Sequence, residues 1–104
     1  MSACVIHGDL VYTAGIVAGD PSADTAGQTR QILARIDALL AEAGTDKSCL
    51  LRANIWLADM ATFEAMNRVW DAWVDPEATP ARATVEARLA RPDYRVEIMV
   101  IAAR

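Results

Sequence analysis

The chain has 104 residues, the usual size of one domain, and we expect a single domain over residues 1–104. Its net charge of −4 and the absence of any run of Lys or Arg argue against a nucleic-acid partner, which needs a basic stripe. Apolar residues make up 54% of the chain against about 45–50% in an average soluble protein, so we expect self-association to bury the surplus.

The cysteines do not indicate a metal site, and no cofactor is expected. Cys4 and Cys49 lie far apart without a CxxC motif, and His7 is the only histidine. Lone thiols in an acidic chain are typical of a reduced, cytoplasmic protein. No charged-then-apolar leader opens the chain, and no apolar run approaches the roughly 18 residues of a membrane span, so no membrane partner is expected.

The chain begins with the pattern of a β-hairpin. Residues 3–7 and 10–14 are short β-type runs, and the Gly8-Asp9 pair between them is a turn signal. Residues 15–22 contain Gly19-Asp20-Pro21 and are expected to form a loop.

A first helix is predicted over residues 23–43. Apolar residues recur there at helical spacing: Ile32, Leu33, Ile36, Leu39, Leu40 and Ala43. Gly44 follows where a helix end favours a left-handed residue. Thr25 with Gln28 three residues later fits a capping box, which would start the helix late.

The middle of the chain predicts a strand and a second helix. Residues 49–58 alternate, and one face of this strand is expected to carry Leu51, Ala53, Ile55 and Leu57. A helix over residues 61–74 carries an apolar stripe: Phe63, Met66, Trp70 and Trp73. We expect this stripe to pack in the core. Asp75-Pro76 ends the helix, because the residue before a proline avoids helical angles.

Two further β-type runs, residues 80–87 and 94–103, complete the order ββαβαββ. This order predicts an α+β fold in which both helices cover one face of one mixed sheet. The last strand is expected to turn Val96, Ile98, Val100 and Ala102 toward the helices, leaving Met99, Ile101 and Ala103 on the second face. Since an apolar sheet face does not stay in water, we expect copies of the chain to pack sheet to sheet, with pockets where copies meet.

Arg82 opens the penultimate strand in an apolar setting. A guanidinium group is always charged and costly to bury, and its planar fork matches a small carboxylate with two parallel hydrogen bonds. The alternative is a structural ion pair with Glu86 on the same strand face or with a residue of another subunit. Thr84 points to the same side as Arg82 by strand alternation. From the residues alone, a carboxylate ligand and a structural ion pair stay equally open.

Three motifs together resemble the reactive intermediate deaminase (Rid) family, also named YjgF/YER057c/UK114. They are Pro80-Ala81-Arg82 opening a β-run, Val96-Glu97-Ile98 with Ile101-Ala102, and Thr13-Ala14-Gly15 closing the hairpin. The segments 63–67 and 41–44 fit the same pattern, so the resemblance covers nearly the whole chain. It implies a chorismate-mutase-like fold and a homotrimer with three clefts between subunits.

The resemblance also implies site residues. In the family, the arginine matching Arg82 holds the carboxylate of a 2-imino or enamine acid, and the backbone N–H of the glycine matching Gly15 assists. Asn67 matches a cleft position on the second helix. A glutamate near the end of the last strand positions the water that hydrolyses the C=N bond to a keto acid and ammonia.

This chain departs from the family pattern at several of these positions. Met99 stands where the family has its water-positioning glutamate. Thr84 replaces the cysteine that often follows two residues after the arginine, and Ala14 replaces the serine before the glycine. Glu97 is interpreted as the partner of a neighbouring arginine, because it lies about 7 Å from Met99 along the strand, beyond hydrogen-bond reach. Carboxylate capture is thus expected to be retained and hydrolysis weakened.

The leading functional hypothesis is a deaminase-like hydrolase of 2-iminobutanoate or 2-iminopropanoate type with reduced activity, in which Arg82 and Thr84 are the catalytic residues. The alternative is a non-catalytic trimeric binding module for small carboxylate metabolites. A third activity, the ribonuclease attributed to some family members, is disfavoured by the acidic charge and the single His7.

Overall fold

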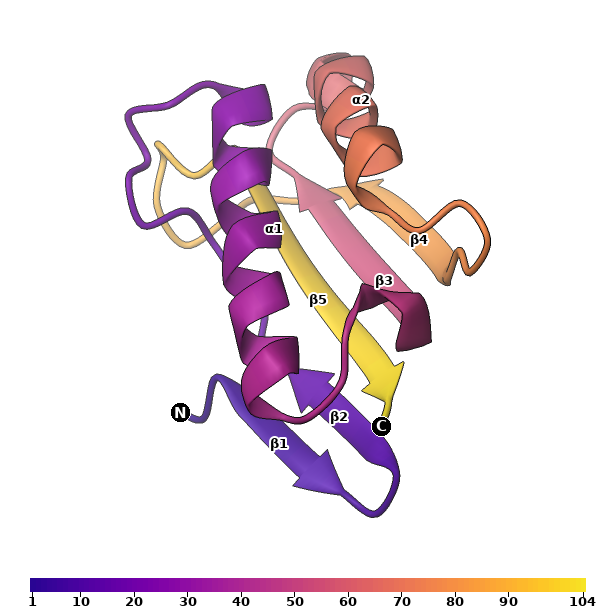
Figure 1. Cartoon of the computed structure of the whole chain (residues 1–104). Helices are drawn as coiled ribbons and strands as arrows, with labels where there is room; N and C mark the ends of the chain where they lie inside the picture. The colour runs from indigo at the N-terminus through magenta and orange to yellow at the C-terminus, as the bar shows by residue number, and fades with distance from the viewer.

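The computed structural model describes residues 1–104 and contains two helices on one face of a five-stranded sheet (Figure 1). Its elements are β1 (Cys4–His7), β2 (Leu10–Thr13), α1 (Thr25–Glu42), η1 (Lys47–Cys49), β3 (Leu50–Leu57), η2 (Met60–Thr62), α2 (Phe63–Trp73), β4 (Ala81–Glu86) and β5 (Val96–Ala103). The strand order is β1-β2-β5-β3-β4; β3 and β4 are parallel, and the other neighbours are antiparallel. The predicted ββαβαββ order and mixed sheet are confirmed.

The predicted hairpin joins β1 to β2 through the two residues Gly8 and Asp9, with His7 opposite Leu10. Only Gly8 of this pair has a positive φ, +58°. A turn with left-handed backbone at its first central residue alone is of type II′, and it favours glycine there because a Cβ would be strained. The Gly-Asp order therefore specifies both the turn and the register of the hairpin.

Helix α1 begins at a different cap from the one predicted. The side chain of Asp24 accepts a hydrogen bond from the Gly27 N–H (2.8 Å) and caps the helix one residue before Thr25. The capping box was wrong, because the Gln28 N–H that Thr25 would cap already donates to Asp24 O (2.8 Å). The Gln28 side chain is therefore free for another role. Gln28 is fully buried and donates from Nε2 to the carbonyl oxygens of Pro21 and Ala23, at 3.1 and 3.0 Å.

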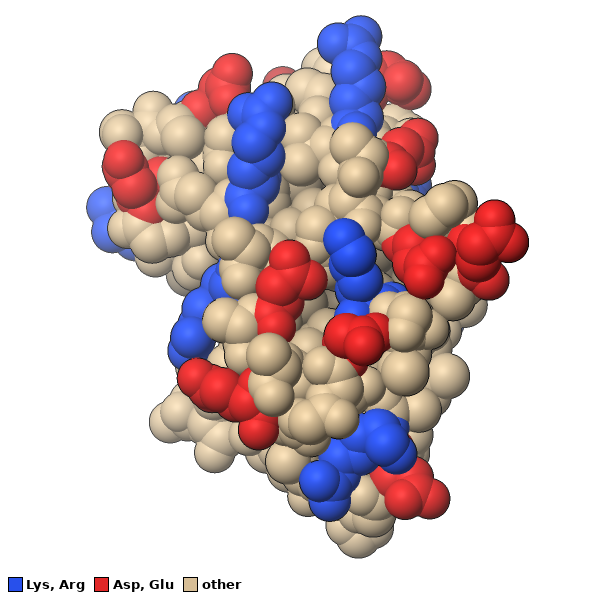
Figure 2. All heavy atoms as spheres, viewed as in Figure 1, with Lys and Arg blue, Asp and Glu red and all other residues tan.

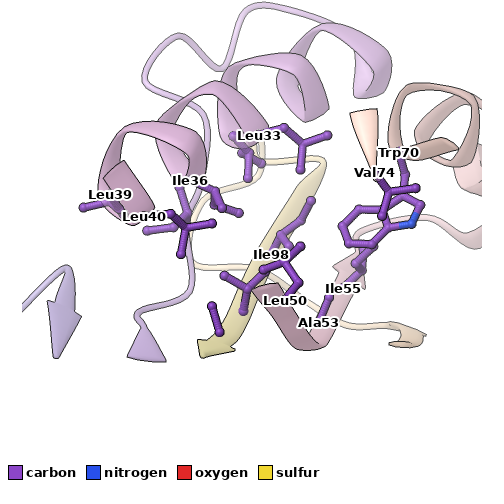
Figure 3. Close-up of a cluster of buried hydrophobic side chains, with 14 of the residues drawn as sticks. Leu33, Ile36, Leu39, Leu40, Leu50, Ala53, Ile55, Trp70, Val74 and Ile98 are labelled. Carbon is purple, nitrogen blue, oxygen red and sulfur yellow. The ribbon is translucent and has the colours of Figure 1, made fainter. Parts of the chain in front are cut away.

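The hydrophobic core fills the space between the helices and the sheet. Figure 3 shows Leu33, Ile36 and Leu40 of α1 directed toward the sheet that carries Ile55 and Ile98. The expectation for β5 is confirmed, since four alternate residues have no exposed surface: Val96, Ile98, Val100 and Ala102. Each large side chain buried in this way stabilises the fold by about 1.5–3 kcal/mol.

One strand residue faces the opposite side from the one expected. Leu51 was predicted to share a face with Ala53, but it is 48% exposed, whereas Leu50 is buried. The pairing with β5 shifts between Leu50 and Arg52, so Leu51 is an extra residue on this strand. Such a bulge interrupts the two-residue alternation, which the sequence pattern alone does not reveal.

Two surface turns are held by aspartate–serine pairs. The hydroxyl and then the amide of Ser48 donate to Asp46 and lower the pKa of its carboxyl below the ordinary 3.8. Ser22 lowers the pKa of Asp20 in the same way. Because both pKa values are lowered in the folded chain, the two turns stabilise the fold at any pH above the ordinary aspartate pKa. That stabilisation is lost as the pH falls through the lowered pKa of the folded chain.

The two faces of the molecule differ in character. On the face that carries the helices, acidic and basic side chains are interspersed (Figure 2). The opposite face of the sheet exposes apolar side chains, among them Val5 (51%), Tyr12 (37%) and Val85 (49%). Neither helix is long and apolar enough to span a bilayer.

Candidate functional site

Arg82 lies under the helices at the edge of the sheet. On β4 it is in register with Ala53 of the parallel neighbour β3, and Ala53 is fully buried beneath the helix layer. Residues in register on adjacent strands point to the same face. Arg82 therefore points toward α2, and because β4 is an edge strand its side chain is only half-buried.

The Arg82 guanidinium is held by three residues of α2. Its Nη1 donates a hydrogen bond of 2.7 Å to Asn67 Oδ1. Its Cζ lies 5.5 Å from the centroid of the Trp70 ring and 5.7 Å from that of Phe63. A cation over an aromatic face is stabilised by about 0.5–1 kcal/mol or more where water is excluded. These contacts fix the group and leave its remaining N–H donors available.

No carboxylate in the chain neutralises Arg82. The nearest candidate predicted from the sequence, Glu86, accepts a hydrogen bond from the Met60 N–H (2.9 Å) instead. The one ion pair in the chain joins Arg91 to Asp93. An ion pair of Arg82 with Glu86 is thus absent, and the guanidinium is open to an anion from outside the chain.

Thr84 adds an unpaired hydroxyl beside Arg82. It is in register with buried Ile55, so it faces the helix layer as Arg82 does. Its Oγ1 is buried and has no hydrogen-bond partner. A buried polar atom left unpaired costs about 1–3 kcal/mol, so this hydroxyl can gain from a partner outside the chain. Arg82, Thr84 and Asn67 together form what we name the arginine half-site.

Gly15 presents a free backbone donor just after β2. On either side of it, Ala14 N–H donates to Ala3 O (2.9 Å) and Ile16 N–H donates to Ile98 O (2.8 Å). The N–H of Gly15 itself donates no hydrogen bond within the chain. The anchored neighbours therefore fix the orientation of an amide that a ligand can use. A hollow of about 660 Å³ opens here, and Ala14 and Gly15 line it together with Arg35.

The carboxylate of Glu97 lies directly against Gly15. A Cβ placed on Gly15 would overlap the Glu97 carboxylate, so only glycine fits while the carboxylate keeps this position. Met99 occupies the position where the sequence comparison expects the family's water-positioning glutamate. It lies two residues after Glu97 on β5, opposite Asn54. The arginine expected to pair with Glu97 is not supplied by this chain. Ala14, Gly15 and Glu97 together form what we name the glycine half-site.

Within one chain the two half-sites do not meet. Arg82 points to the helix-covered face, whereas Glu97 points to the other face, because its neighbours Val96 and Ile98 are buried under the helices. In addition, β3 lies between β4 and β5 in the sheet. The structure thus brings Arg82, Thr84 and Asn67 together, but it keeps them apart from Gly15, Ala14 and Met99.

Sequence reasoning missed the aromatic support of the arginine. Phe63, Asn67 and Trp70 are spaced i, i+4, i+7, which places them along one side of a helix. That spacing could have indicated that one side of α2 contacts a single group, because an apolar stripe interrupted by one amide is unusual in a core. Trp70 does pack in the core as predicted, with 4% of its surface exposed, and it also supports Arg82.

Known proteins of one family match this chain over nearly its whole length. The family model described as Endoribonuclease L-PSP matches residues 1–104. A RutC family protein of Haemophilus ducreyi is 48% identical over 102 residues, which are 98% of this chain and 87% of the relative. The 3-aminoacrylate deaminase RutC of Acinetobacter baylyi is 34% identical over 100 residues, which are 90% of this chain and 79% of the relative.

Solved structures agree with this assignment. A YjgF family member from Neisseria meningitidis superposes with a TM-score of 0.97 at 48% identity, covering 100% of this chain and 87% of that one. A YjgF/YER057c/UK114 family member from Mycobacterium tuberculosis superposes with a TM-score of 0.92 at 30% identity, covering 100% and 86%. The chain therefore belongs to the Endoribonuclease L-PSP family, the Rid or YjgF/YER057c/UK114 family that its motifs resemble, and has the fold of that family.

Proposed function

We propose that the chain is a hydrolase of small 2-imino or enamine acids that works as a homotrimer. Each cleft joins the arginine half-site of one subunit to the glycine half-site of the next. The observation that carries the proposal is the half-buried Arg82 guanidinium, held by Asn67 and two aromatic rings and left without an acidic partner. A small carboxylate matches its planar fork with two parallel hydrogen bonds.

The chemistry of the cleft follows from these groups. Arg82 holds the substrate carboxylate, and the free Gly15 N–H donates a hydrogen bond to the substrate from the facing subunit. The Glu97 carboxylate accepts a proton from a water molecule as the oxygen of that water bonds to the imine carbon. That proton then passes to the nitrogen and gives a carbinolamine. As its hydroxyl group becomes the carbonyl, the hydroxyl proton passes through Glu97 to the nitrogen, the C–N bond breaks, and ammonia leaves. An enamine enters this path after a proton adds to its β-carbon and it becomes an imine.

The name of one relative supports this substrate class. The relative from Acinetobacter baylyi is named 3-aminoacrylate deaminase. The compound in that name carries a carboxylate and an enamine, the two groups for which Arg82 and the pair of Gly15 and Glu97 are suited. Its 34% identity covers 90% of the chain, so we extend the class of reaction to this protein and leave the individual substrate to experiment.

The activity can be tested by competition for the imine. A 2-imino acid is generated in the presence of semicarbazide, which traps it, and the protein competes by hydrolysing it first. We expect the protein to lower the trapping rate in proportion to its concentration, because a positioned water attacks an activated C=N bond faster than bulk water. The three substrates to test are 2-iminopropanoate, 2-iminobutanoate and 3-aminoacrylate. If the protein hydrolyses none of them faster than buffer alone does, the hydrolase proposal fails and the binding module takes its place.

The assembly has its own test. The apolar sheet face with Tyr12 and Val85 predicts that copies associate through it, because such a face is costly to leave in water. Light scattering at micromolar concentration should report about three times the chain mass of 11.2 kDa. A monomer at that concentration would contradict the trimer, and with it the clefts, since one chain does not bring the two half-sites together.

A further inference from the structure

The segment between β4 and β5 gathers positive charge outside the site described above. Residues 88–95 contain three of the chain's nine arginines, Arg88, Arg91 and Arg95, in a protein whose net charge is −4. All three line a cavity of about 610 Å³, together with Tyr94. We name residues 87–95 the arginine loop. No residue of the arginine half-site or of the glycine half-site lines this cavity.

The loop is fixed by a buried glutamine. The Gln28 side chain, with no exposed surface, donates from Nε2 to Asp93 O (2.9 Å) and accepts at Oε1 from Arg95 N–H (2.8 Å). At the start of the loop, Ala87 N–H donates to Leu57 O (2.9 Å), and at its end Arg95 O accepts from Ala58 N–H (3.0 Å). The backbone that carries the arginines is therefore held before any ligand arrives, which lowers the entropy cost of binding.

One acidic residue, Glu86, lines this cavity, and Asp93 lies beside it in the arginine loop. Asp93 pairs with Arg91 (2.9 Å), and the Arg91 guanidinium also lies 5.3 Å above the Tyr94 ring. Glu86 accepts the Met60 N–H instead of an arginine. Arg88 and Arg95 have no acidic partner in the chain. Two uncompensated guanidinium groups and a third that is stacked in place thus border one cavity.

We propose that the arginine loop binds a small anion with two or more negative charges, carried by phosphate groups or by several carboxylates. Each guanidinium offers a planar pair of donors that matches a phosphate or carboxylate oxygen pair, and separate arginines can engage separate charges. A cavity of this volume lies within the range of small-molecule sites, about 300–1,000 Å³. A ligand with one charge would leave at least one guanidinium unpaired and bind more weakly.

Calorimetry at low ionic strength tests the proposal on the whole protein, with pyrophosphate, citrate and acetate as probes. We expect saturable binding of pyrophosphate or citrate. Acetate should bind with an affinity lower by about tenfold or more. The tighter of the two multivalent probes identifies the phosphate or the carboxylate source. R88Q/R95Q should weaken multivalent binding by about tenfold or more, whereas R30Q, an exposed arginine of α1 outside the cavity, should leave it unchanged.

A second variant keeps the result decisive if R88Q/R95Q does not fold. R88K/R95K keeps both charges and removes both forks, and it should weaken binding by a smaller factor than R88Q/R95Q. Wild-type protein that binds neither pyrophosphate nor citrate overturns the proposal. If, in addition, both double variants lose subunit association, the arginines pair with acidic groups of a neighbouring copy and do not bind a small anion.

Discussion

Replacing Arg82 by alanine is expected to abolish hydrolysis of 2-imino acids while the fold persists. The substitution removes the group that holds the substrate carboxylate, and an unanchored imine gains nothing from an oriented water. Arg82→Lys is the sharper variant, because it keeps the charge and loses the planar fork. It should cost about 1.5–3 kcal/mol of transition-state stabilisation, a loss of about ten- to a hundredfold in kcat/KM.

The control for Arg82 lies on the helix above it. Arg68 is an exposed arginine of α2, so Arg68→Ala removes the same charge from nearby surface without touching the half-site. Its kcat/KM should match that of the wild type. Equal binding of a 2-keto acid by wild type and Arg82→Ala in calorimetry would show that the carboxylate binds elsewhere. Asn67→Ala, which removes the hydrogen bond to Nη1, should have an intermediate effect.

Most of the fold could be predicted from the sequence because apolar residues recur at regular spacing along its strands and helices. The alternation of β5 predicted which four of its residues face the helices, and all four are fully buried. The errors occurred where a local competitor intervened. Asp24 capped α1 ahead of Thr25, and an extra residue in β3 turned Leu51 outward. Neither a competing cap nor a bulge changes the average periodicity from which the element is recognised.

The candidate site could be predicted only residue by residue. Arg82 was singled out because an arginine among alanines is unusual, and Gly15 and Asn67 followed from the family resemblance. The position of the carboxylate did not follow. Glu97 and Met99 point to the same face of β5, so alternation cannot choose between them, and only the contact of Glu97 with Gly15 distinguishes the two.

Replacing Glu97 by glutamine is expected to lower kcat for imine hydrolysis by about a hundredfold or more, because the amide cannot accept a proton from the attacking water. KM should change little, since the carboxylate of the substrate is held by Arg82. Gly15→Ala should lose activity as well, because its Cβ would displace the Glu97 side chain. Met99→Glu should bring little gain in rate. A large gain, with Glu97→Gln still active, would return the role of the carboxylate to position 99.

Mixing two inactive variants tests at once that Arg82 and Glu97 act in the same cleft and that they come from different subunits. Arg82→Ala keeps Glu97, and Glu97→Gln keeps Arg82. In trimers reassembled from an equal mixture, a cleft is intact only where a Glu97→Gln subunit supplies the arginine and an Arg82→Ala subunit supplies the glutamate. Random assembly makes about a quarter of the clefts intact, so the mixture should recover about a quarter of the wild-type activity. If both residues served one cleft from the same chain, every cleft would lack one of them and mixing would restore nothing.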